Sequence, residues 1–183
     1  TSFMLLHTLG ELRLEGSAFQ RSKALLLLAY LALEGSRERQ FLSRLFWPGI
    51  DNALGNLTMT LTRLKKAAPD VLETDNLYAR TTIQTDTQLL DTAINNKAWN
   101  EVLELYKGSF LQGVRSEDWN TEVEEWVYQK REAFAAKARE ALLHIAKQEA
   151  SKGQFDAAAL YALKAYHLRD APEPELEQLE QLY

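Results

Sequence analysis

The chain has 183 residues, of which 46% are hydrophobic and 26% charged, with a net charge of -5 and no cysteine. These proportions exclude a disordered or collagen-like chain, and the lack of cysteine excludes disulfides, thiolate metal sites and a cysteine nucleophile. The longest apolar run, residues 24–33, is half as long as a membrane-spanning helix, so we expect no membrane contact. The lack of cysteine favours a cytoplasmic protein. The length leaves room for two small domains.

The first fifty residues predict short strands followed by helices. Residues 1–16 alternate between apolar and polar side chains and predict two short strands. A helix is expected from Ser22, as its cap, to Gly35, and its apolar surface on nearly every side places it at the centre of a core. A second helix follows after Ser36, and the Trp-Pro-Gly sequence at 47–49 ends it.

A third helix and a hairpin complete the predicted N-terminal domain. The helix is expected to run from Asp51, a good cap, to Ala68. Residues 71–83 have the form of strand, turn and strand, with the turn at 75–76, because Asp and Asn tolerate left-handed conformations. Strands, three helices and a closing hairpin predict a winged-helix domain over residues 1–83.

The second half of the chain predicts helices only, over residues 87–95, 98–107, 118–150, 155–168 and 173 onward. The element GQFDAA at 153–158 is typical of tetratricopeptide-like helix pairs. The predicted fold class is therefore mostly α, with a winged helix followed by an all-α tetratricopeptide-like domain over residues 84–183. We expect this second domain to be incomplete at its C-terminus.

Catalytic patterns are poor in this sequence. His7, His144 and His167 have no spacing that places two of them on one helix turn, and no Gly-x-Ser-x-Gly elbow is present. The glycines form no loop that could cradle a phosphate. We therefore expect no catalytic residue, no cofactor and no metal site, and a protein that is not an enzyme.

Charge is divided unevenly along the chain. Residues 1–83 contain 10 Lys and Arg against 8 Asp and Glu, whereas the remaining hundred residues contain 11 against 18. The acidic total argues against nucleic-acid binding, but the N-terminal part taken alone tolerates an anionic partner.

The third predicted helix carries the most informative pattern. Its apolar positions, expected to pack on the first two helices, are Ala53, Leu54, Leu57, Leu61, Leu64 and Ala68. Small, amide, thioether and basic residues occupy the opposite side: Asn52, Gly55, Asn56, Met59, Thr62, Arg63 and Lys66, with Thr58 and Lys65 at the margins. Such a face can enter the major groove of DNA, with the glycine allowing close approach, or it can be an ordinary solvated face.

Further cations surround this helix in the predicted domain. Arg21 and Lys23 flank the start of the first helix, whose dipole favours phosphate, and Arg80 lies on the hairpin. The candidate DNA-binding residues are Arg21, Lys23, Arg37, Arg39, Arg44, Asn52, Asn56, Thr58, Met59, Thr62, Arg63, Lys66 and Arg80.

The order of these motifs resembles the antibiotic-regulatory type of bacterial transcriptional activator, which has an OmpR-like winged helix followed by a bacterial transcriptional activator domain. The resemblance rests on the combination of motifs at 21–35 (RSKALLLLAYLALEG), 41–49 (FLSRLFWPG), 56–57 with 61–66 (NL and LTRLKK), 106–113 (YKGSFLQG), Trp126 with Arg131, 153–158 and 167–173 (HLRDAPE).

This resemblance implies a sequence-specific transcription regulator, usually an activator. Such proteins bind direct repeats in double-stranded DNA near promoters as homodimers or side-by-side protomers, and they contact RNA polymerase. The third helix then has the role of the recognition helix and Arg80 that of the wing. Many relatives carry Arg or Gln early in this helix, whereas this sequence has Leu54, Gly55, Thr58 and Met59, which removes possible guanine contacts. The alternative is a protein-interaction platform whose winged helix does not bind DNA.

Overall fold

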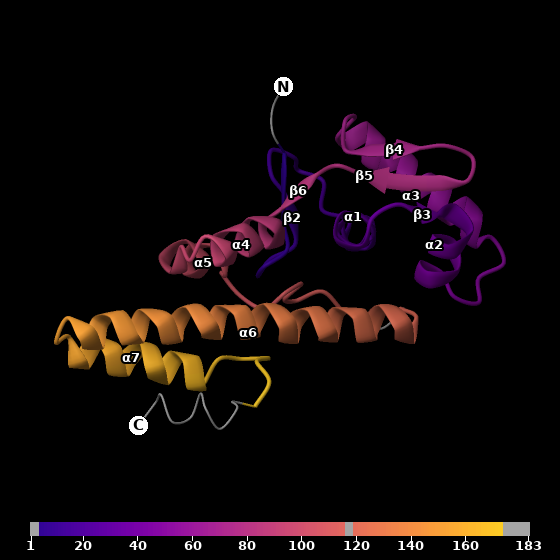
Figure 1. The fold of residues 1–183 in the computed structure, drawn as a ribbon. Helices are drawn as coiled ribbons and strands as arrows, with labels where there is room; N and C mark the ends of the chain where they lie inside the picture. The colour runs from indigo at the N-terminus through magenta and orange to yellow at the C-terminus, as the bar shows by residue number, and fades with distance from the viewer. Residues whose placement is uncertain (1–3, 116–118, 174–183) are drawn as a thin grey trace. The chain divides into compact units, whose positions relative to one another are not determined.

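The computed structural model describes residues 4–115 and 119–173 (Figure 1). The chain is mostly helical, which confirms the predicted fold class at this level. It divides into two compact units: a first unit of Thr1–Asp86 with Leu111–Val127, and a second unit of Thr87–Phe110 with Tyr128–Tyr183. Within the described residues, every helix is too short or too polar to cross a membrane.

A three-stranded sheet of the first unit joins the N-terminal strands to a strand more than 60 residues later. β1 (Leu5–His7) pairs antiparallel with β2 (Arg13–Leu14) and parallel with β6 (Gln84–Thr85). The two strands expected within residues 1–16 are confirmed, whereas β6 was not predicted as a separate strand. Leu6 lies opposite Leu14 in the register, and both side chains are buried, which directs this face toward the core.

Helix α1 (Ser22–Glu34) lies in the core of the first unit, as its sequence predicts. Every residue from Ala24 to Leu31 is buried. The helix ends at Gly35, whose φ of 89° lies in the region that favours glycine. The expectation that Ser22 caps the helix is wrong: Arg21 occupies the N-cap position, and no side chain caps the helix there. Ser22 is already helical, so its hydroxyl lies one position too late to act as the cap.

Helices α2 (Arg39–Phe46) and α3 (Ala53–Ala67) pack together beside α1. In α2, Leu42, Leu45 and Phe46 are buried as predicted, and the helix stops before Trp47. The third helix begins one residue later than expected, at Ala53, because Asn52 and not Asp51 occupies its N-cap position.

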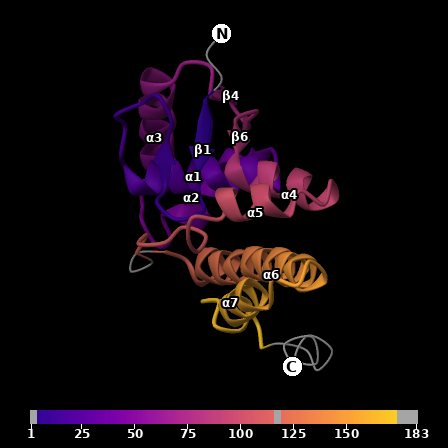
Figure 2. The same ribbon diagram turned by 90° about the vertical axis from the view of Figure 1, so that its left-hand side faces the viewer.

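A second sheet of the first unit has the strand order β3-β5-β4 and lies beside α3 (Figures 1 and 2). The predicted hairpin is confirmed as β4 (Leu72–Thr74) and β5 (Tyr78–Thr81), which pair antiparallel. The two-residue strand β3 (Arg37–Glu38), between α1 and α2, pairs with β5 and was not predicted.

The hairpin turn is organised by one carboxylate. Asp75 Oδ1 accepts hydrogen bonds from the backbone N–H groups of Tyr78 at 2.8 Å and of Leu77 at 2.7 Å. These bonds favour the ionised form, so they lower the pKa of Asp75 below the ordinary value of 3.8. Asp75 thus closes the turn by bonding to its own following backbone, as Asx-turns do.

We expect acid to weaken this turn only at pH values below the ordinary pKa of aspartate. Because the folded-state pKa is lowered, the stabilisation is fully present above 3.8 and is lost as the pH falls through the folded pKa. An NMR titration of the Asp75 carboxyl group should give a midpoint below 3.8, with the Leu77 and Tyr78 amide shifts following it. A midpoint at or above 3.8 would contradict this account of the turn.

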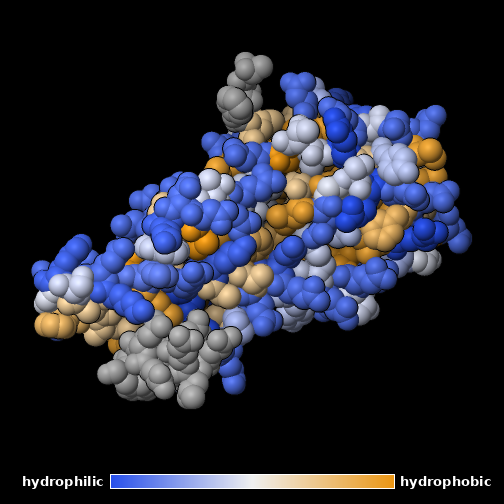
Figure 3. All heavy atoms as spheres, viewed as in Figure 1, coloured by the Kyte–Doolittle hydropathy of each residue, from blue (hydrophilic) through white to orange (hydrophobic). Residues whose placement is uncertain are grey.

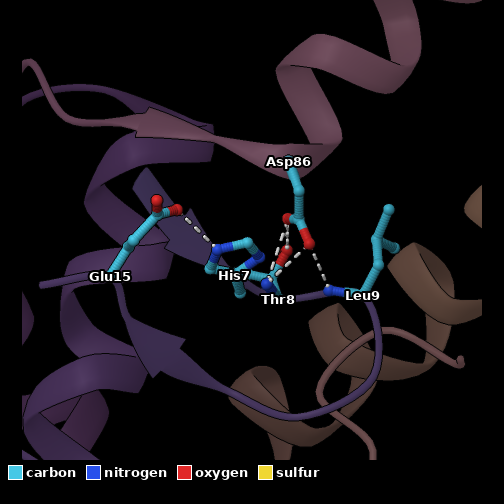
Figure 4. A network of polar contacts seen from close by, with 5 residues as sticks. All are labelled: His7, Thr8, Leu9, Glu15 and Asp86. Carbon is cyan, nitrogen blue, oxygen red and sulfur yellow. Dashed lines mark hydrogen bonds and ion pairs between the residues drawn. The ribbon is translucent and has the colours of Figure 1, made fainter. Parts of the chain in front are cut away.

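A second, buried carboxylate ties the chain after β6 to the chain after β1 (Figure 4). Asp86 follows β6 and is 3% exposed. Its Oδ2 accepts from the backbone N–H of Leu9 at 2.8 Å, and its Oδ1 accepts from the hydroxyl of Thr8 at 2.6 Å. The Thr8 N–H lies 3.0 Å from both carboxylate oxygens. The charge is therefore satisfied by donors that lie 77 and 78 positions earlier in the chain.

The second unit is built from helices, as predicted. These are α4 (Asp86–Asn95), whose first residue belongs to the first unit, α5 (Trp99–Leu105), the part of α6 (Thr121–Ser151) that follows Val127, and α7 (Phe155–Tyr166). The last two lie side by side in Figures 1 and 2, and Gly153, with a φ of 76°, lies in the turn between them. The helix predicted from residue 173 onward falls on residues 174–183, outside the described part of the chain.

Side-chain contacts hold these helices together. Leu142 and Leu143 of α6 form a small core with Ala165 of α7. Trp99 of α5 stacks on His144, with ring centroids 4.1 Å apart and planes 3° from parallel. The buried Arg139 donates from Nε to the carbonyl oxygen of Ala165 at 2.9 Å, so its guanidinium contributes to packing between α6 and α7.

Candidate nucleic-acid interface

Helix α3 has one buried and one exposed face, largely as its sequence predicts. Leu57, Leu61 and Leu64 are its buried residues. The predicted outer positions are exposed or half-buried, and Met59 is 51% exposed. Leu54 contradicts the prediction that it packs in the core, because it is 45% exposed. Its place in the first turn explains this, since the buried part of α3 begins only at Leu57.

The exposed face of α3 borders a surface hollow of about 410 Å³ within the first unit. Helix α3 contributes Asn56, Met59 and Arg63 to its lining, and the start of α1 contributes Arg21 and Lys23. Five of the thirteen candidate residues therefore line one concave surface. Sequence reasoning missed Trp47, Ile50 and Thr60, which also line it; Trp47 and Ile50 follow α2 and enter only through the packing of α2 against α3.

The cations of this surface are available to an anion in different degrees. Arg21 and Arg63, which line the hollow, and Lys66, which is exposed on α3 outside it, form no ion pair with any residue in the described part of the chain. Lys23 is half-buried, with Nζ 4.8 Å from the centroid of the Trp47 ring, a distance that allows a cation–π interaction. The ring holds one positive charge against the wall of the hollow, and the two arginines add to it.

Arg39 has a structural use in the first unit. Its guanidinium donates to the hydroxyl of Thr58 at 2.7 Å and to the carbonyl oxygen of Asp75 at 2.9 Å. One side chain thereby ties α3 to the hairpin turn. This fixes the angle between the helix and the hairpin, and it occupies donors that the sequence assigned to DNA.

The charge of Arg80 is balanced within the hairpin. Arg80 lies opposite Glu73 in the register of β4 and β5, and its guanidinium forms an ion pair with that carboxylate. Both residues line a second hollow together with Asp75. Two carboxylates beside the one arginine make this hollow a weaker site for phosphate than the hollow beside α3.

The remaining candidates lie outside the hollow beside α3. Arg37 donates to the carbonyl oxygen of Ser36 at 2.9 Å, and Arg44 is exposed on α2. Asn52 is exposed at the N-cap of α3, and a Cβ atom at Gly55 would lie 2.4 Å from its Oδ1. Gly55 therefore makes room for the Asn52 side chain, a purpose that the sequence pattern does not reveal.

The threonines of α3 direct their hydroxyl protons into the helix. Thr58 donates to the carbonyl oxygen of Leu54, and Thr62 to that of Thr58, each at 2.9 Å. Such bonds to the preceding turn satisfy the hydroxyl donor. The outward donors among the predicted positions of α3 are consequently amide and cationic groups, those of Asn52, Asn56, Arg63 and Lys66.

Among the residues that the structure describes, no group of three or more His, Cys, Asp or Glu side chains could hold a metal ion. The chemistry available at the hollow beside α3 is therefore that of cations, an amide and apolar side chains on a concave surface. Comparisons of the chain with models of protein families, with curated proteins and with solved structures find no match.

Proposed function

We propose that this chain binds double-stranded DNA through the exposed face of α3 and the hollow beside it, and that it regulates transcription without catalysis. The observation that carries the proposal is the convergence of Arg21 and Lys23, at the start of α1, with Asn56 and Arg63 of α3 on one concave surface. Cations bind the phosphate backbone, whereas an amide and a guanidinium can read base edges.

The order of elements in the first unit supports a winged helix as the DNA-binding fold. Three helices are followed by the β4–β5 hairpin, and Arg39 connects α3 to the turn of that hairpin. In such a fold α3 enters the major groove while the hairpin touches the adjacent backbone. The α6–α7 pair, turned at Gly153, supports a tetratricopeptide-like scaffold in the second unit.

The resemblance to the antibiotic-regulatory type of activator further suggests that the protein acts in the cytoplasm as an activator, binds direct repeats as a homodimer or as side-by-side protomers, and contacts RNA polymerase. Selection of bound duplexes from a random pool, followed by sequencing and repeated at two salt concentrations, tests the DNA-binding proposal. Enrichment of a repeated motif with salt-sensitive affinity is the expected result. A folded protein that enriches no sequence would favour the alternative of a protein-interaction platform.

The salt dependence of DNA binding should reveal how many phosphates the cations of the interface neutralise. Arg21, Lys23 and Lys66 together predict a slope of roughly -3 in log K against log [salt], because each neutralised phosphate contributes about -0.9. Replacing Lys66 by alanine should make this slope less negative by about 1, and it should weaken binding to all duplexes by a similar factor.

Arg13 provides the matched control for this measurement. It is exposed on β2, in the other sheet of the first unit, and it is not part of the hollow beside α3. The Arg13→Ala variant removes the same formal charge and should keep the slope of the wild-type protein. Equal slopes for the wild type and the Lys66→Ala variant would remove Lys66 from the interface.

A further inference from the structure

The exposed face of α3 presents apolar groups at its middle. Met59 is 51% exposed and lines the hollow beside α3 together with Ile50, which is 48% exposed. Figure 3 shows orange, apolar side chains among blue, hydrophilic ones over the part of the first unit that carries α2 and α3. Contiguous apolar surface rimmed by polar residues marks a binding surface, whereas single exposed apolar side chains are common, so it is the pairing of Met59 with Ile50 in one hollow that indicates a contact surface.

The threonine hydroxyls nearest to Met59 along α3 are already engaged as donors. Thr58 and Thr62, one position before it and three after it, donate their hydroxyl protons to carbonyl oxygens of the preceding turn. The hydroxyl oxygen of Thr58 additionally accepts from Arg39. Between Asn56 and Arg63, whose donors face outward, the helix face therefore offers a thioether and no free hydroxyl donor.

The positive charges around Met59 favour an anionic ligand. Arg21, Lys23 and Arg63 line the same hollow as Met59, and Arg21 and Arg63 have no acidic partner among the described residues. An apolar peptide would leave Arg21 and Arg63 without a counter-charge, whereas a DNA duplex supplies phosphates and, within its major groove, one apolar group. That group is the C5-methyl of thymine.

We propose that Met59 contacts the C5-methyl group of a thymine, so that this protein selects duplexes with a thymine at the position facing the middle of α3. The inference rests on the proposed DNA-binding function and specifies its sequence preference. Arg63, one turn later on the same face, holds a phosphate or a base edge next to that thymine. Burying one methyl group predicts a preference for thymine over uracil of roughly fourfold.

Uracil substitution isolates this contact, because deoxyuridine lacks only the C5-methyl and keeps the base pair and the phosphate. The duplex selected from the random pool is resynthesised with each thymine in turn replaced by deoxyuridine, and its affinity is measured by fluorescence anisotropy. The wild-type protein should lose roughly fourfold in affinity at one thymine of each half-site. The Met59→Ala variant should bind the thymine and uracil duplexes equally at that position.

Two variants control for general effects on the helix. Met59→Leu keeps an apolar side chain and should retain the discrimination, whereas Lys66→Ala should weaken both duplexes by the same factor. Equal wild-type affinity for thymine and uracil at every position, or full discrimination by Met59→Ala, would overturn the inference while leaving DNA binding intact. Failure to enrich any duplex would instead overturn the proposed function, and the thymine preference with it.

Discussion

Replacing Asp86 by alanine is expected to lower the free energy of unfolding of the first unit by about 3 kcal/mol. The carboxylate is 3% exposed and accepts from two backbone N–H groups and one hydroxyl. Alanine removes these charge-assisted bonds and leaves the donors of Thr8 and Leu9 buried, where lost hydrogen bonds are most costly. The bonds also join the two residues that follow β1 to the residue that follows β6, so their loss loosens the β2-β1-β6 sheet.

Chemical denaturation followed by tryptophan fluorescence measures this effect, because Trp47 and Trp126 both belong to the first unit. Thr8→Val removes only the hydroxyl bond and should cost about 1.5 kcal/mol. Asp70→Ala, at an exposed aspartate after α3, serves as the matched control and should change the stability by less than about 0.5 kcal/mol. A loss of less than about 1 kcal/mol for Asp86→Ala would show that the network contributes little to stability.

Local sequence patterns predicted most of the regular elements. The unbroken apolar run of α1, followed by Gly35, predicts a buried helix and its end, and both are observed. Asp75 and Asn76 between two short apolar stretches predict the hairpin turn, and Asp75 caps it. Each of these features depends on residues close together in the chain, where propensity and periodicity decide the structure.

Features that depend on distant residues were missed. Neither strand β3 nor strand β6 exceeds two residues, and each forms through pairing with a remote strand, so no periodicity marks them. The role of Asp86 requires the backbone of Thr8 and Leu9, far earlier in the sequence. Pairwise contacts across the fold, not local preference, determine such features.

The sequence predicted which face of α3 forms the candidate site, but it did not predict which other residues of the fold belong to that site. Periodicity places Met59 and Arg63 on the outer side of α3, as observed. It does not show that Arg21 shares a hollow with them, nor that Arg39 and Arg80 are engaged with Thr58 and Glu73. A count of arginines in the first 83 residues thus overstated the charge available to DNA, because hydrogen bonds and ion pairs within the fold occupy part of it.

Replacing Arg63 by alanine is expected to cost roughly 1–3 kcal/mol of DNA-binding free energy, or about 5- to 150-fold in affinity, if its guanidinium reads a base. Arg63 is exposed on α3, lines the hollow beside it and has no acidic partner among the described residues. Its donors are therefore uncommitted before DNA arrives, in contrast to those of Arg39. A gel-shift titration with the selected duplex measures the loss.

Arg63→Lys distinguishes a base contact from a phosphate contact. Lysine keeps the positive charge but not the planar fork that bonds the O6 and N7 atoms of guanine together. If Arg63 reads guanine, Arg63→Lys should lose most of the affinity that Arg63→Ala loses, and only at the duplex position where a guanine is selected. If Arg63 holds a phosphate, the lysine variant should bind nearly as well as the wild type on every sequence. Unchanged affinity in Arg63→Ala would exclude both roles and remove Arg63 from the interface.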